Sequence, residues 1–117
     1  MHNFKELNVW KASKDFCVKM YKNVANFPAS ETYGITSQLK RASVSIPSNI
    51  AEGAGRSTKK DFARFISIAM GSSFEVETQL IISKELEFLS KEKYDALITD
   101  LNLVQKQLVN FQKHLYK

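Results

Sequence analysis

Six basic residues between positions 40 and 64 have side chains suited to binding phosphate. They are Lys40, Arg41, Arg56, Lys59, Lys60 and Arg64. All three arginines of the protein fall in this window, which holds only two acidic residues and therefore carries most of the net charge of +5. Arginine suits phosphate because its planar guanidinium donates two parallel hydrogen bonds. The window predicts a surface that binds RNA or DNA.

A solvated basic surface explains the same charges equally well. In that interpretation the cations form local salt bridges, such as one between Arg56 and Glu52, and others with Asp61. In the nucleic-acid interpretation, Arg56, Lys59, Lys60 and Arg64 come first, because they surround a predicted helix start whose free amides attract anions. Lys40 and Arg41 come second, because one of two neighbouring residues on a helix is expected to face the bundle.

The remaining reactive residues do not form a catalytic or metal-binding pattern. The histidines, His2 and His114, lack the acid three residues earlier that di-metal sites in helical bundles require. Glu75 and Glu77 point to different sides of a helix, so one is expected to be exposed and the other paired. Cys17 lies in an apolar stripe without a nearby histidine, which indicates a structural thiol. We expect no enzymatic activity, no cofactor and no metal.

Two helices are predicted in the first half of the chain. The first begins at Asn8, the expected cap, and ends before Pro28. Its apolar residues are Trp10, Cys17, Met20, Tyr21, Val24 and Phe27. The second begins near Ile35 or Thr36, is expected to be kinked by Pro47, and ends at Gly53-Ala54-Gly55.

Two longer helices are predicted in the second half. The third begins at a cap on Ser57 or Thr58 and continues to about Leu89. Apolar residues such as Phe74 and Ile81 lie off its main face, which is typical of a central helix or one that packs against another subunit. Gly71-Ser72-Ser73 predicts a close approach of two helices. The fourth helix follows a Ser90 cap, and its seam comprises Tyr94, Leu97, Leu101, Val104, Leu108, Phe111 and Leu115.

Composition agrees with one all-α domain over residues 1–117. The chain is 44% hydrophobic and has only four glycines and two prolines, which disfavours a β-sandwich or barrel with many turns. Four helices with short connections predict an up-down-up-down four-helix bundle. The short apolar runs predict no membrane span. A single cysteine is compatible with the reducing cytoplasm, where we expect the protein.

Two long motifs resemble the signature of the four-helix-bundle family of 23S rRNA intervening-sequence proteins. They are Ser45-Ile46-Pro47-Ser48-Asn49-Ile50-Ala51-Glu52-Gly53 and Gly71-Ser72-Ser73-Phe74-Glu75-Val76-Glu77-Thr78-Gln79-Leu80. The opening Phe4-Lys5-Glu6-Leu7-Asn8-Val9-Trp10 and the Tyr33-Gly34-Ile35 turn also fit. The segment Leu86-Glu87-Phe88-Leu89 departs from the family pattern, because it lacks the glycine of a Leu-Gly-Tyr-Leu turn.

The resemblance implies a bacterial, non-enzymatic protein that assembles into a ring-shaped homopentamer. It also implies a relation to the accessory proteins of diversity-generating retroelements, which bind a reverse transcriptase and nucleic acid. We therefore expect a homo-oligomeric scaffold that binds RNA or DNA through the basic residues. The alternative is a protein-interaction module that binds no nucleic acid, with a reverse transcriptase or another protein as its partner.

Overall fold

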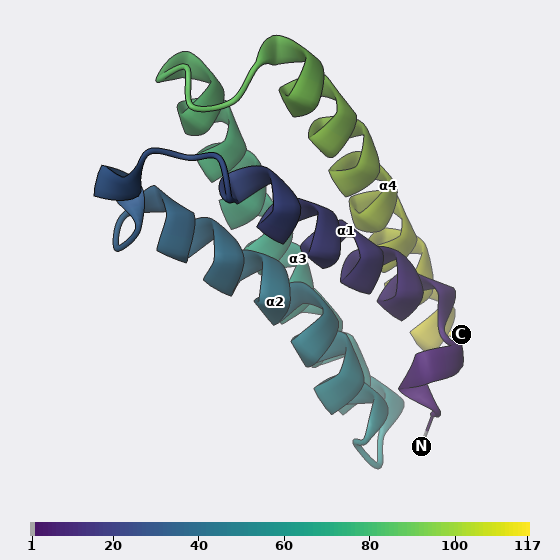
Figure 1. The fold of residues 1–117 in the computed structure, drawn as a ribbon. Helices are drawn as coiled ribbons and strands as arrows, with labels where there is room; N and C mark the ends of the chain where they lie inside the picture. Colours follow the sequence, from purple (N-terminus) through teal and green to yellow (C-terminus); the bar gives the residue numbers. More distant parts are fainter. Residues whose placement is uncertain (1) are drawn as a thin grey trace.

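The structure, a computed structural model, describes residues 2–117. It contains α1 (Asn8–Val24), α2 (Ile35–Ala54), α3 (Lys59–Glu85) and α4 (Lys91–Leu115), with short 3-10 helices η1 (Phe4–Glu6) and η2 (Ala29–Glu31). Each α-helix packs against two neighbours in an up-down-up-down bundle measuring 44 × 24 × 20 Å (Figure 1). The predicted all-α four-helix fold is confirmed.

Side-chain caps fix the starts of the two long helices. The Thr58 hydroxyl accepts a hydrogen bond from the Asp61 amide at 3.1 Å, and the Ser90 hydroxyl accepts one from the Lys93 amide at 3.2 Å. Both predicted caps are confirmed, and each satisfies an amide that has no partner within its helix. The prediction for α1 was wrong: Asn8 is its first helical residue, and Leu7 occupies the cap position without a side-chain bond.

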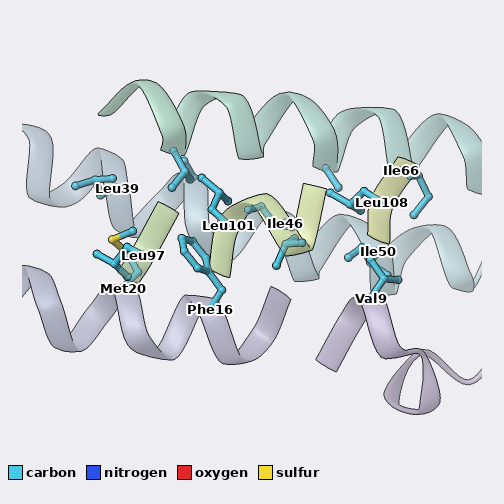
Figure 2. Close-up of a cluster of buried hydrophobic side chains, with 14 of the residues drawn as sticks. Val9, Phe16, Met20, Leu39, Ile46, Ile50, Ile66, Leu97, Leu101 and Leu108 are labelled. Atoms are coloured by element: carbon cyan, nitrogen blue, oxygen red, sulfur yellow. The ribbon is translucent and has the colours of Figure 1, made fainter. Parts of the chain in front are cut away.

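The core lies between all four helices and is filled by aliphatic and aromatic side chains (Figure 2). The predicted seam of α4 is confirmed, since its residues are buried or, for Tyr94 and Phe111, half-buried. The predicted stripe of α1 was partly wrong. Phe16 is buried, whereas Cys17 is half-buried and Tyr21 is exposed. One residue along a helix turns the side chain by about 100°, so Phe16 faces the core where Cys17 does not.

Pro47 lies within α2, which continues to Ala54. Next to it, the Asn49 amide donates to the Ser45 carbonyl at 2.8 Å and to the Ser45 hydroxyl at 2.9 Å. The Ser45 hydroxyl also lies 2.8 Å from the Ser72 hydroxyl of α3. Ser72 therefore confirms the predicted close approach of two helices. Gly71 does not take part, because a side chain there would meet no atom of this chain within 4 Å.

The connection between α3 and α4 begins earlier than predicted, because α3 ends at Glu85 and not near Leu89. The Phe88 amide donates to the Ser83 carbonyl at 2.9 Å, and the Glu87 amide donates to the Lys84 carbonyl at 3.0 Å. These two bonds form a Schellman motif. Glu87 occupies its left-handed position with φ of 64°, where glycine is usual.

Replacing Glu87 with glycine is expected to stabilise the fold by about 1 kcal/mol, because a side chain in the left-handed region costs about 1–2 kcal/mol. Denaturant unfolding at one fixed protein concentration measures the change. Glu85→Gly is the matched control: it lies in the last turn of α3 and is expected to lower stability instead. A loss of stability on Glu87→Gly would contradict the proposed strain.

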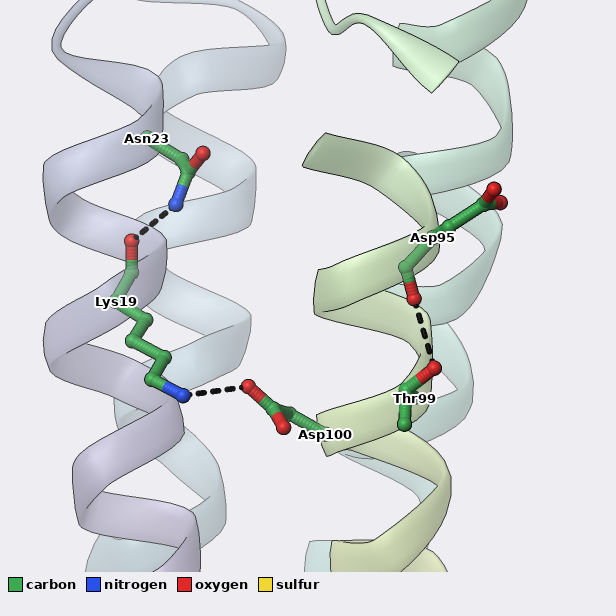
Figure 3. A network of polar contacts seen from close by, with 5 residues as sticks. All are labelled: Lys19, Asn23, Asp95, Thr99 and Asp100. Atoms are coloured by element: carbon green, nitrogen blue, oxygen red, sulfur yellow. Dashed lines mark hydrogen bonds and ion pairs between the residues drawn. The ribbon is translucent and has the colours of Figure 1, made fainter. Parts of the chain in front are cut away.

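One ion pair joins the first and last helices at the surface (Figure 3). The Lys19 ammonium of α1 donates to the Asp100 carboxylate of α4 at 2.8 Å. This hydrogen bond, together with the carboxylate charge, raises the pKa of Lys19. Since both side chains are partly exposed, the pair fixes the alignment of two neighbouring helices more than it stabilises the fold.

Candidate nucleic-acid interface

Four parts of the chain meet at one end of the bundle, where both termini and the connection between α2 and α3 lie (Figure 1). The His2 amide donates to the Ala54 carbonyl at 3.0 Å, which fixes the N-terminal segment to the end of α2. The Gln112 side chain of α4 donates to the Ala63 carbonyl of α3 at 2.9 Å. The start of α3 is thus held by the chain on several sides.

Two guanidiniums are held over one aromatic ring at this end. The central carbons of Arg56 and Arg64 lie 4.6 and 4.7 Å from the centre of the Phe65 ring. Phe65 is only 6% exposed, so the two arginines complete its cover. Stacking on a ring orients a guanidinium while leaving its edge N–H groups able to donate. The arrangement positions two phosphate-binding groups close together before any ligand arrives.

The surrounding charges are mostly unpaired. Arg64 forms an ion pair with Asp61 at 3.1 Å, in agreement with the solvated interpretation of that pair. The salt bridge predicted between Arg56 and Glu52 is absent, because Arg56 stacks on Phe65 instead. Lys59 and Lys60 are exposed at the start of α3, and neither forms an ion pair. We call Arg56, Lys59, Lys60 and Arg64 together the arginine end.

The structure does not bring the other two predicted site residues to the arginine end. Lys40 and Arg41 lie in the second turn of α2, whereas the arginine end begins after its last turn. As expected for neighbours on a helix, one is half-buried and one exposed: the Lys40 ammonium lies 5.2 Å from the centre of the Tyr21 ring, and Arg41 faces solvent. The six basic residues therefore form two separate groups at opposite ends of α2.

The sequence profile of the 23S rRNA-intervening sequence protein family matches residues 5–110. The chain belongs to this family. A solved structure of a protein of unknown function from the S23 ribosomal protein family of Bacteroides thetaiotaomicron is similar, with a TM-score of 0.81 and 26% identity. The match covers 90% of this chain and 98% of that one. No curated protein matches the sequence.

The family motif that ends in Gly53 has a packing role at the arginine end. A side-chain carbon at Gly53 would lie 2.7 Å from the Phe62 Cδ1 and 2.8 Å from the Phe65 Cβ. Only glycine lets the end of α2 approach α3 this closely. Gly53 therefore positions Phe65, the ring on which both arginines stack, and the glycines form no phosphate loop of their own.

Gly53→Ala is expected to destabilise the fold by about 1–2 kcal/mol, because overpacking outweighs the better helix propensity of alanine. The Phe65 Cβ cannot move away without a shift of the α3 backbone. Thermal unfolding measures the effect. Gly55→Ala is the matched control, since its new carbon would meet only the Glu52 carbonyl at 3.6 Å. Equal stability of the two variants would contradict the packing role.

Two contributors to this end of the family fold were missed from the sequence. Tyr116 lines one surface hollow with Lys60 and Arg64, and His2 lines another with Arg56 and Lys59. Both come from the ends of the chain, far in sequence from the basic window. Only the antiparallel order of α3 and α4 could have indicated Tyr116, because it brings the end of α4 to the start of α3.

The other reactive side chains have structural surroundings. Within residues 2–117 no three His, Cys, Asp or Glu residues are grouped to hold a metal ion. His2 packs edge-on against Phe62, with ring centres 5.2 Å apart. Glu77 accepts a hydrogen bond from Gln105 at 2.8 Å, while Glu75 is exposed. Burial raises the pKa of the Cys17 thiol, which opposes the reactive thiolate form.

Among the described residues, no helix combines the length and apolar character that crossing a membrane requires.

Proposed function

We propose that the protein is a non-enzymatic, cytoplasmic scaffold that assembles into a homopentameric ring and binds RNA or DNA through the arginine end. The observation that carries the proposal is the pair of guanidiniums over Phe65, at 4.6 and 4.7 Å from the ring centre. A preorganised pair loses little side-chain freedom on binding phosphate, so more of the contact energy appears as affinity. Lys59 and Lys60 add two unpaired charges beside it.

Assembly would multiply this contact. A ring presents one arginine end per subunit, so weak phosphate contacts add along a single polyanion. The contacts are with the backbone of the nucleic acid and not with base edges, so binding by the arginine end is independent of sequence.

An uncovered apolar face on α3 supports assembly. Ile68, Phe74, Ile81 and Ile82 are exposed there, at spacings of three, four and seven residues or one residue apart. Gly71 lies on the same helix with open space above it, which leaves room for a neighbouring backbone. Several exposed large apolar side chains on one helix are typical of a protein interface. A ring of five copies is the assembly that the family resemblance implies.

Fluorescence anisotropy with labelled RNA and DNA of mixed sequence tests the proposal. The wild-type protein is expected to bind both at low salt, with similar affinity across sequences, and to lose affinity steeply toward physiological salt. Absence of binding at low salt would overturn the nucleic-acid function and leave the protein-interaction alternative, which the exposed α3 face would then serve.

A further inference from the structure

The second basic group lies in a groove at the end of the bundle opposite the arginine end. We call it the tyrosine groove; its walls include Tyr21, Tyr33, Ser37, Lys40 and Arg41. The chain enters from the connection between α1 and α2 and continues into the first turns of α2. The groove has a volume of about 500 Å³, which is within the range of sites for small ligand groups.

Tyr33 offers an almost free aromatic face. It is 97% exposed, although its neighbours Gly34 and Ile35 are half-buried at the start of α2. Tyr21 is 42% exposed on the same groove, so two rings are available there. A lone exposed ring requires no explanation, but two rings in one groove form a surface on which a flat group can stack.

The charges in the tyrosine groove are all positive. The Lys40 ammonium lies over the Tyr21 ring, and Arg41 is exposed beside it. Neither cation forms an ion pair, and no carboxylate lines the groove. The groove therefore matches a ligand that combines a flat ring with a negative charge, and an unpaired nucleotide has both.

We propose that the tyrosine groove binds an unpaired nucleotide of a single-stranded RNA or DNA, with the base on Tyr33 and the phosphate at Lys40 and Arg41. The inference rests on the proposed function and narrows its ligand to single strands. In a duplex the neighbouring bases cover both faces of each base, so no face is free to stack on Tyr33. The arginine end holds either form through phosphate, and the tyrosine groove adds the preference for single strands.

A comparison of Tyr33→Ala with Tyr33→Phe tests this preference. The probes are a labelled single strand of about 20 nucleotides and the duplex of the same sequence, titrated at one low salt concentration. Tyr33→Ala is expected to weaken single-strand binding roughly tenfold, because one stacked base is lost, and to leave duplex binding unchanged. Tyr33→Phe keeps the ring and is expected to bind like the wild type. A fluorescent base analogue in the strand should be quenched by the wild type and by Tyr33→Phe only.

The outcomes separate this inference from the proposed function. Binding of both probes by Tyr33→Ala with wild-type affinity would overturn the tyrosine groove as a nucleotide site and leave the arginine end intact. A lower assembled mass of Tyr33→Ala in light scattering would assign Tyr33 to a protein interface and also overturn the inference. Failure of the wild type to bind either probe would overturn both proposals.

Discussion

Reversing three charges at the arginine end is expected to remove most nucleic-acid binding. In the variant, Arg56, Lys59 and Lys60 become glutamate; all three are exposed, so the fold should persist. At 0.1 M salt each phosphate contact contributes about 0.9 log units of affinity on duplex DNA, so three lost contacts lower the affinity by several hundredfold. Repulsion from the new carboxylates increases the loss. Anisotropy titration gives the two dissociation constants.

A matched variant separates position from net charge. Lys22, Lys93 and Lys106 are exposed lysines without ion pairs, away from the start of α3. Changing all three to glutamate alters the net charge by the same amount. This variant is expected to lose much less affinity, because only the long-range field changes. Equal losses in the two variants would show that overall charge, and not the arginine end, governs binding.

Phe74→Arg is expected to dissociate the ring. Phe74 is 54% exposed on the apolar face of α3, so a charged side chain there does not disturb the core. In an interface, however, it would place an unpaired charge against apolar groups, which costs several kcal/mol per contact. Light scattering after gel filtration should give about 66 kDa for five copies of the 13.3-kDa wild-type chain and the mass of one chain for the variant.

Leu103→Arg is the control for assembly. Leu103 is 53% exposed, so the two substitutions have nearly the same effect on the free surface, but Leu103 lies on α4 and not on the apolar face of α3. Its variant should keep the wild-type mass. A wild-type chain that is monomeric at micromolar concentration would contradict assembly altogether. Dissociation by Leu103→Arg alone would place the interface on α4.

The local rules of helix formation predicted most of the fold. The α4 seam was readable because its apolar residues repeat without a fault, and the Thr58 and Ser90 caps because hydroxyl residues precede apolar runs. Two features were not readable. Phe16 and Cys17 are adjacent and both apolar, so periodicity alone could not decide which faces the core. Glu87 gave no sign of a helix end, because the Schellman motif is held by backbone bonds and not by its side chain.

The candidate site was predicted by residue type but not by arrangement. Lys40 and Arg56 fall in one short window of sequence, yet a helix advances about 1.5 Å per residue, so α2 carries them to opposite ends of the bundle. The stacking of Arg56 and Arg64 on Phe65 depends on the approach of α2 to α3 at Gly53. That approach is a tertiary contact, and no spacing within either helix reports it.

The salt dependence of binding tests the central claim most directly. The logarithm of the binding constant, measured against the logarithm of salt concentration, should fall linearly for the wild type. For the Arg56, Lys59 and Lys60 charge-reversal variant, the slope should be shallower by about two units or more, because three phosphate contacts per engaged subunit are lost. An unchanged slope and affinity in an assembled variant would contradict phosphate binding by the arginine end.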